Sequence, residues 1–139
     1  RIDPFSIEFK AEFVKNQQDL FTILNSSVTC LFNIFSLSLR HIVQFLHSIT
    51  GIESFSSPEE VLRIGERTNN LVRLFNLREG LTKEEDTLPN RFSTEPLKEG
   101  PSRGRVVDLE VMLEEYYFVR GWDEEGIPKP DTLKTLGLP

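Results

Sequence analysis

The sequence has 139 residues, the length of one ordinary domain, and carries a formal net charge of −6 from 22 acidic and 16 basic residues. The basic residues are scattered rather than gathered on one stretch, so we expect no nucleic-acid partner. Cys30 is the only cysteine and no signal peptide opens the chain, which together predict a reducing, cytoplasmic setting. The chain opens at Arg1 and has a single methionine, Met112, which fits a piece of something longer.

A first helix is expected to begin at Asp3 and Pro4, because an Asp cap followed by Pro at the first helical position is a helix-start signal. The helical period predicts a buried face formed by Phe13, Val14, Gln17, Leu20, Phe21 and Leu24. The charged and polar residues fall largely on other faces: Lys10, Glu12, Lys15, Asn16 and Asp19. We expect the helix to end or distort at Asn25, Ser26 and Ser27.

The stretch from Leu20 to Leu39 contains no charged residue and is long enough to span a bilayer. Eight Ser, Thr and Asn side chains interrupt it, and each unpaired polar group buried in lipid costs roughly 1 to 3 kcal/mol. The stretch is therefore expected to be protein interior, and no membrane is expected as a partner. A buried helix-turn-helix and a segment that passes a bound cofactor both remain open.

A second helix is expected over 37–50, ended by Gly51. Its two histidines, His41 and His47, are six residues apart and so lie on opposite sides of a helix, which does not favour a shared metal. A third helix is expected from a capping box of Ser57, Pro58 and Glu60 to a stop at Gly80. The period predicts its buried stripe as Val61, Ile64, Thr68, Leu71, Val72 and Phe75.

Residues 81–106 contain three prolines and two glycines without either helical or strand periodicity, which predicts a long extended loop. Such a loop usually has a function or lies over a partner surface. A further helix is expected from an Asp108 cap to Gly121, and Asp131 could cap a last turn that ends at Gly137. No stretch alternates like a strand, so the predicted fold is all-α: an irregular multi-helix single domain over 1–139.

Spacing alone identifies no catalytic residue. The carboxylate pairs Glu84-Glu85, Glu114-Glu115 and Glu124-Glu125 read as solvated surface, since neighbours on a helix point about 100° apart. No phosphate-binding loop, metal-binding His pair or CxxC motif is present. By itself, Cys30 reads as a small core residue.

Four parts of the sequence stand out together: KAEFVKNQQDLFTILNSSVTCLF in the first helix, GERTNNLVRLFNLREGLTKEEDTLPNRF over 65–92, the EPL and GP that follow, and EEYYFVRGWDEEGIP over 114–128. They resemble the C-terminal region of a known family, the tungsten-containing aldehyde:ferredoxin oxidoreductases. The resemblance implies that this is the C-terminal fragment of a larger enzyme that oxidises aldehydes to carboxylates and passes electrons through a 4Fe-4S cluster to ferredoxin. It also implies an N-terminal part as partner, tungstopterin as cofactor and no activity for the fragment alone.

In that family the first helix ends in Asp-x-x-Gly-Leu-Cys, in which the Asp binds the pterin and the Cys is the fourth cluster ligand. The matching positions here are Asn25, Val28, Thr29 and Cys30. The resemblance therefore implies that Asn25 binds the pterin and Cys30 binds the 4Fe-4S cluster. A 4Fe-4S cluster takes four thiolates, so the other three must come from outside this chain.

The three substituted positions, Asn25, Val28 and Thr29, motivate an alternative: a non-catalytic helical module that serves as a structural or partner-binding part and has lost the cofactor. Five further residues in the best-matching stretch carry no assigned role beyond capping or inter-domain salt bridges: Arg67, Asn76, Arg78, Asp86 and Arg91.

Overall fold

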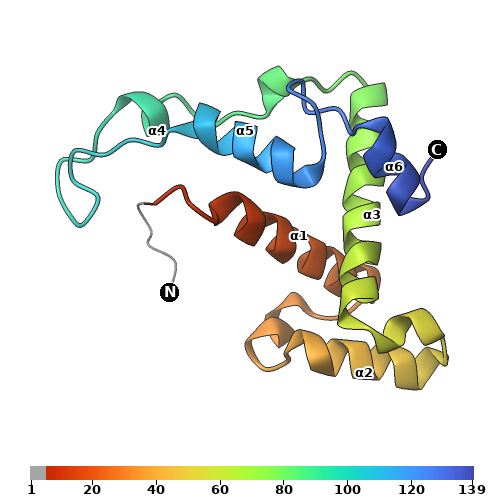
Figure 1. The fold of residues 1–139 in the computed structure, drawn as a ribbon. Coiled ribbons are helices and arrows are strands. Elements are labelled where there is room, and N and C mark those ends of the chain that lie inside the picture. Colours follow the sequence, from red (N-terminus) through yellow and green to blue (C-terminus); the bar gives the residue numbers. More distant parts are fainter. Residues whose placement is uncertain (1–5) are drawn as a thin grey trace.

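The computed structural model describes residues 6–139 and confirms the all-α class (Figure 1). Across these residues there is no strand, only isolated bridges between Leu97 and Arg103 and between Trp122 and Pro128. The helices are α1 (Lys10–Ser26), α2 (Leu39–Thr50), α3 (Pro58–Arg78), α4 (Arg91–Thr94), α5 (Leu109–Arg120) and α6 (Pro130–Leu136). Short 3₁₀ turns connect them: η1 (Leu31–Phe35), η2 (Glu53–Ser56) and η3 (Lys83–Glu85).

The long helix α3 is the axis of the fold, and α1 crosses it (Figure 1). The crossing point is Gly65, which is buried because its backbone lies against that of Asp19 on α1. A Cβ atom at position 65 would overlap the Asp19 carbonyl oxygen and lie 2.8 Å from its carbon. Only glycine therefore permits this close approach of the two helices.

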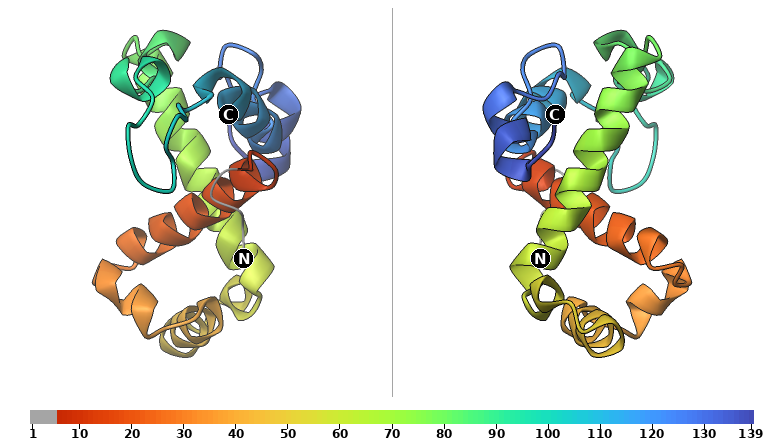
Figure 2. Two further views of the ribbon diagram at one scale, coloured as in Figure 1. Left: turned by 90° about the vertical axis from the view of Figure 1, so that its left-hand side faces the viewer. Right: turned by 90° about the vertical axis from the view of Figure 1, so that its right-hand side faces the viewer.

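The apolar core lies on one side of this crossing, where the end of α1, the start of α3 and helix α2 meet. Its buried members are Ile23, Leu24, Ile42, Val43 and Val61. The opposite side of the crossing contains α5, which packs along the first half of α1, and α6, which packs against α3. Figure 2 shows that η1 and the loop after α3 project to the same side of the molecule.

The first helix begins later than the sequence predicts. Asp3 and Pro4 lie outside the described residues, and α1 starts at Lys10 after Phe9, whose φ of 62° is left-handed. The buried face is also only half right. Phe13 and Val14 are 50% and 42% exposed, whereas Asp19, expected elsewhere, is 1% exposed because it pairs with a buried arginine.

The stripe predicted for α3 shows the same division. Val61 is fully buried and Ile64 partly so, but the second half of the stripe is exposed at Leu71, Val72 and Phe75. The helix buries Asn70 and Arg73 instead, because α5 and the segment after it bring polar partners to that face. The apolar stripe of α3 is therefore longer than the part of it that residues 6–139 bury.

The start of α3 confirms the predicted Ser57 cap, since the Ser57 hydroxyl accepts a hydrogen bond from the Glu60 backbone at 3.3 Å. The Glu60 carboxylate does not accept a hydrogen bond from the Ser57 backbone N–H, as a capping box requires, and the Ser57 hydroxyl donates to the Glu59 carboxylate at 2.7 Å. This bond lowers the pKa of Glu59 below its usual value. Glu60 instead reaches Arg63 one turn later at 3.6 Å.

The other boundaries are close to those expected. Helix α2 starts two residues after the predicted 37, and Gly51 and Gly121 end α2 and α5 with left-handed φ of 66° and 68°. Asp108 stands at the cap of α5 without a side-chain cap bond, and Lys129 rather than Asp131 is the cap residue of α6. The predicted loop contains two short turns, η3 and α4, but is otherwise irregular.

None of the helices over residues 6–139 combines the length and the apolar character needed to cross a membrane. The uncharged stretch from Leu20 divides among the end of α1, a turn and η1. The expectation that it is wholly interior is wrong for its second half, because Val28, Phe32 and Phe35 are 94%, 78% and 84% exposed in this chain.

Candidate functional site

The segment that joins α1 to η1 carries both residues predicted to contact a cofactor. Asn25 occupies the last turn of α1 and is exposed, and Cys30 is the cap residue of η1. Cys30 is also exposed, so the expectation of a small core residue is wrong. Among the residues that follow it, Ile34 and Leu39 pack against the core, while Phe32 and Phe35 are exposed like Cys30.

The turn has the hydrogen bonds of a helix-ending Schellman motif. The Thr29 backbone N–H donates to the Leu24 carbonyl at 3.2 Å, and the Val28 N–H donates to the Asn25 carbonyl at 3.1 Å. This motif requires a left-handed residue, and Val28 fills the position with a φ of 55°. A β-branched residue is strained there, since its Cβ lies close to the backbone carbonyl oxygen.

Cys30 has no companion metal ligands in the described part of the chain. Residues 6–139 contain no group of three His, Cys, Asp or Glu side chains that could hold a metal ion. His41 is committed to local bonds with Ser38, and the His47 Nδ1 atom lies 3.1 Å from the Ile52 carbonyl oxygen. The donor set therefore fits a cluster only as a single thiolate added to ligands from elsewhere.

A buried ionic network centred on Asp19 holds α1, the helix that precedes this segment. Arg120 Nη1 on α5 donates to Asp19 Oδ1 at 2.6 Å, and both side chains are almost fully inaccessible. Asn69 of α3 donates to the same carboxylate oxygen at 2.7 Å, and Lys15 reaches the other at 3.1 Å. Because α1, α3 and α5 each supply a partner, the network fixes the angles among all three helices.

Arg120 is satisfied on every side. Its Nη2 donates to Gln18 Oε1 at 2.6 Å, and its Nε donates to the Tyr116 hydroxyl at 3.0 Å. The Tyr116 hydroxyl in turn donates to Gln18 at 2.6 Å. A buried guanidinium with this many partners is a structural anchor, since a missing partner would leave a desolvated charge.

A second anchor ties down the start of the long loop. Arg73 of α3 makes a two-pronged bond to Asp86, at 3.1 and 2.7 Å, and donates from Nε to the Gly126 carbonyl at 2.8 Å. The Tyr117 hydroxyl donates to Asp86 at 2.6 Å. Burial, and then the neighbouring Asp86 carboxylate, raise the pKa of Tyr117 well above its usual value.

Trp122 packs against this second anchor. Its indole N–H donates to Asn70 Oδ1 at 2.8 Å, and the Arg73 guanidinium lies 4.9 Å from the ring centroid. Trp122 therefore shields the ion pair between Arg73 and Asp86 from water on one face. The role of Asp86, which sequence could not assign, is to connect the loop to α3 and α5.

The other unassigned residues have minor structural contacts. Arg78 pairs with Glu79 at 3.3 Å on the surface, and the Arg91 guanidinium lies over the Phe92 ring at 5.7 Å. Arg67 is exposed, and Asn76 accepts a bond from the Leu81 backbone through its carbonyl.

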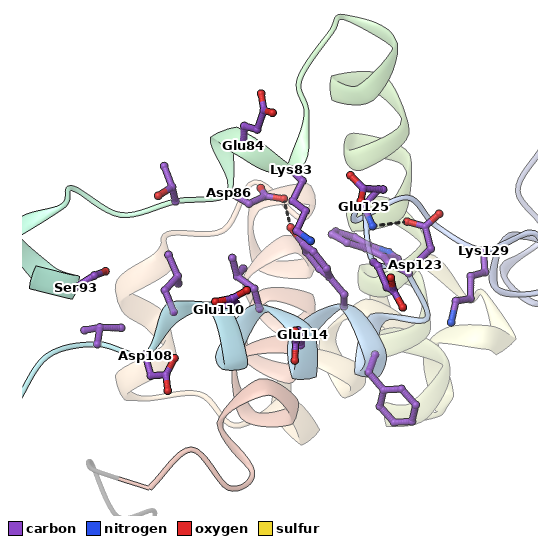
Figure 3. A pocket seen from close by; sticks show the side chains of 18 of the residues that line it. Lys83, Glu84, Asp86, Ser93, Asp108, Glu110, Glu114, Asp123, Glu125 and Lys129 are labelled. Atoms are coloured by element: carbon purple, nitrogen blue, oxygen red, sulfur yellow. Dashed lines mark hydrogen bonds between the residues drawn. The ribbon is translucent and has the colours of Figure 1, made fainter.

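An open cleft of about 1420 Å³ lies between α5, the loop after α3 and the turn over 122–129 (Figure 3). Its lining is strongly acidic: Glu84, Asp86, Asp108, Glu110, Glu114, Asp123, Glu124 and Glu125 against Lys83 and Lys129. Figure 3 shows Asp86 between Ser93 on one side and Lys129 on the other. Asp86 accepts the hydrogen bond from the Tyr117 hydroxyl, and the Asp123 carboxylate accepts from the Glu125 backbone at 3.0 Å. Both of these carboxylates thus hold the local backbone and loop in place.

The roles of Cys30 and Asn25 stay predictions, and sequence reasoning missed the two buried arginines. The only signal for them lay in the positions themselves, because Arg73 and Arg120 stand next to apolar residues on their helices and fall on faces that also carry aromatic side chains. Helical periodicity identifies the buried face from apolar residues alone, so it places every charged residue on the surface, including those that are buried. Their burial depends on partners up to 105 residues away in the sequence.

Comparison with known proteins connects the chain to one family. A family model described as aldehyde ferredoxin oxidoreductase, domains 2 and 3, matches residues 1–138. The tungsten-containing aldehyde ferredoxin oxidoreductase of Pyrococcus horikoshii is 41% identical over 140 residues, and that of Thermococcus kodakarensis is 39% identical over 140 residues. An aliphatic sulfonate oxidoreductase, WOR-like subunit, of Pyrococcus furiosus is 32% identical over 123 residues.

These relatives are much longer than the chain. The match to the Pyrococcus horikoshii enzyme covers 99% of this chain but only 23% of that protein, and the sulfonate oxidoreductase match covers 82% and 19%. A solved structure of the active site complex of benzoyl coenzyme A reductase with 1,5-dienoyl-CoA has the same fold over 99% of this chain and 20% of its own, with a TM-score of 0.77 and 21% identity.

Proposed function

Because the chain belongs to the aldehyde ferredoxin oxidoreductase family, we propose that it is the C-terminal part of a tungsten-containing oxidoreductase that converts aldehydes to carboxylates. The observation that carries this proposal is the match over the whole chain at about 41% identity. The missing three quarters of the relatives' length would form the N-terminal part. The substrate, tungstopterin, cluster and ferredoxin acceptor are all part of the proposal, as are a cytoplasmic setting and a single domain over 1–139.

In this proposal Cys30 supplies one thiolate to a 4Fe-4S cluster whose other three ligands come from the N-terminal part. Its exposure at the cap of η1 supports the role, since a buried thiol could not reach ligands on another part of the protein. When bound, the cluster would carry electrons singly from the cofactor to ferredoxin. The first buried anchor holds α1, the helix that leads to Cys30, against α3 and α5, and the second holds α3 against α5 and the loop.

Asn25 has the weaker assignment. Its exposed amide oxygen can accept a hydrogen bond from a pterin N–H, but it lacks the charge and second oxygen that the family's Asp offers. Val28 would present a branched side chain where the family has glycine, although it keeps the left-handed backbone that the turn requires. The residues thus suit a pterin contact made by an ordinary rather than a charge-assisted bond.

These substitutions favour a second candidate function, a helical structural or partner-binding module without cofactor. The two candidates differ in the polypeptide encoded upstream: the oxidoreductase requires a trio of cysteines there, and the module does not. Neither candidate expects this chain to be active alone.

The test is to produce the chain together with the polypeptide encoded immediately upstream, and to measure iron, tungsten and aldehyde-dependent dye reduction. Cys30→Ser is expected to lower the iron content and to alter the cluster's electron paramagnetic resonance signal, with Ser27→Ala as a control on the same turn. Unchanged iron in Cys30→Ser would contradict the ligand assignment. Absence of an upstream cysteine trio would favour the module.

A further inference from the structure

The second half of α3 exposes an apolar surface. The helical spacing of its apolar residues predicts that another part of the protein covers this surface. Leu71, Val72 and Phe75 are 43%, 52% and 55% exposed. Isolated exposed apolar residues are ordinary, but three within five residues of one helix form a contiguous strip. Such strips in soluble proteins mark contact surfaces.

Val72 forms one wall of a hollow of about 440 Å³ at the junction of α1, α3 and α5. Phe21 of α1 and Leu113 of α5 provide its other apolar walls. Its lining also includes Thr22 and Asn69, which are joined by a hydrogen bond of 3.0 Å from the Thr22 hydroxyl. A concave apolar site with a few fixed polar groups suits one inserted side chain of a partner.

The hollow also contains amide donors that the described part of the chain leaves free. The Asn76 side chain makes no hydrogen bond with residues 6–139, and Gln18 uses only its oxygen, which accepts from Tyr116 and Arg120. Each amide NH₂ group offers two donors. A backbone carbonyl of a bound segment could accept from them.

The residues of α1 that line the hollow share a stripe of the helix with Asn25. Gln18, Thr22 and Asn25 are spaced by four and three residues, so they follow one stripe of α1. The hollow therefore lies on the same face of α1 as Asn25, which is in the last turn of that helix. A polypeptide that approaches Cys30 along α1 would pass over it.

We propose that this hollow is the docking site for the polypeptide that the family relatives carry outside the matched stretch, through one apolar side chain inserted against Val72 and Phe21. The proposal rests on the proposed function for its partner. Two facts identify that occupant: the chain spans only 23% of the relatives' length, and the hollow shares its helix face with Asn25. A second copy of this chain would have no reason to follow the stripe toward Asn25.

The test uses the chain co-produced with the polypeptide encoded immediately upstream, in one reading frame or in two. A photo-crosslinking amino acid is placed at Val72, and a matched probe is placed at Ile49, which is 82% exposed on α2 and outside the hollow. Cross-linked peptides are identified by mass spectrometry. The expected result is a cross-link from position 72 to the upstream polypeptide and none from position 49.

The proposal is overturned if position 72 cross-links only within residues 1–139, only to a second copy, or not at all, and also if positions 49 and 72 give the same products. Val72→Arg, which can extend its charge to solvent in the free chain, should lower the thermal midpoint of the co-produced protein more than Ile49→Arg. Equal shifts would also count against it.

The iron content separates this proposal from the proposed function. A cross-link at position 72 together with unchanged iron in Cys30→Ser retains the docking site and rejects the cluster. Loss of iron in Cys30→Ser without a cross-link retains the cluster ligand and rejects the docking site.

Discussion

Asp19 and Arg120 are separated by 101 residues in sequence and joined by a 2.6 Å hydrogen-bonded ion pair that is almost wholly withdrawn from solvent. The pair connects the first long helix to the last but one, across α3, whose Asn69 contacts the same carboxylate. The position of the Cys30 segment thus depends on residues from the opposite end of the chain. Four predictions follow from the contacts that maintain this arrangement and the turn it supports.

Arg120→Met should destabilise the chain by about 3 to 5 kcal/mol, because it leaves the Asp19 carboxylate buried without its main partner. Denaturant unfolding measures this. The double variant Asp19→Leu/Arg120→Met should lose less than the sum of the two single variants, since no desolvated charge remains from the pair. The control Arg78→Met removes an exposed pair with Glu79 and should change stability by no more than about 0.5 kcal/mol. Equal losses in Arg120→Met and Arg78→Met would contradict the anchor role.

Gly65→Ala should destabilise the chain by about 1 to 3 kcal/mol, although alanine favours a helix, because the added Cβ would meet the Asp19 backbone. The helices would have to separate, which would also lengthen the bond from Asn69 to Asp19. Thermal unfolding followed by circular dichroism measures the loss. Arg67→Ala, on an exposed position of the same helix, serves as the control and should be close to neutral. A neutral Gly65→Ala variant would show that the helices do not cross this closely.

Val28→Gly should stabilise the chain by up to about 1 kcal/mol, since the relief of left-handed strain exceeds the entropy that glycine adds to the unfolded state. Val28 is 94% exposed, so the substitution removes almost no packing. Val28→Ala keeps a Cβ and should gain less. Denaturant midpoints of the three proteins give the order. A Val28→Gly variant less stable than Val28→Ala would mean that Val28 is not held in the left-handed conformation.

Tyr117→Phe should cost about 1 kcal/mol near neutral pH, through loss of the hydrogen bond to Asp86. The pKa of Tyr117 is raised in the folded chain, so the hydroxyl ionises first in the unfolded chain. Its contribution is complete below about pH 10 and is lost as the pH rises above that value. Unfolding curves from pH 7 to 11 should therefore show the gap between the two proteins closing at alkaline pH. A constant gap would contradict the assignment.

Much of the fold could be predicted from residues close together in sequence. Gly51 and Gly121 end their helices where expected, because the left-handed conformation is a local requirement that glycine meets at no steric cost. Ser57 caps α3 for a similarly local reason. The expected contact between the Glu60 carboxylate and the Ser57 backbone N–H is absent because Glu60 reaches Arg63 instead, a choice of side-chain rotamer that spacing does not define.

The cofactor roles of Cys30 and Asn25, inferred from a motif, stay predictions. Their exposure could not be read from an uncharged, apolar stretch that is typical of interior. Within that stretch Ile34 and Leu39 pack against the core, whereas Val28, Phe32 and Phe35 are exposed. An apolar sequence shows that a segment avoids water, but it does not show whether this chain or another polypeptide covers it.

By itself, the sequence determined most of the helices, the ends of α2 and α5, the single thiol and the family, since each of these depends on residue type within a few positions or on matched motifs. The tertiary structure alone decided that Asp19, Asn70, Arg73 and Arg120 are buried, and that Leu71, Val72 and Phe75 are not. The physical reason is that burying a charge or an amide costs free energy unless a partner is in place. Those partners come from distant segments that only the folded chain brings together.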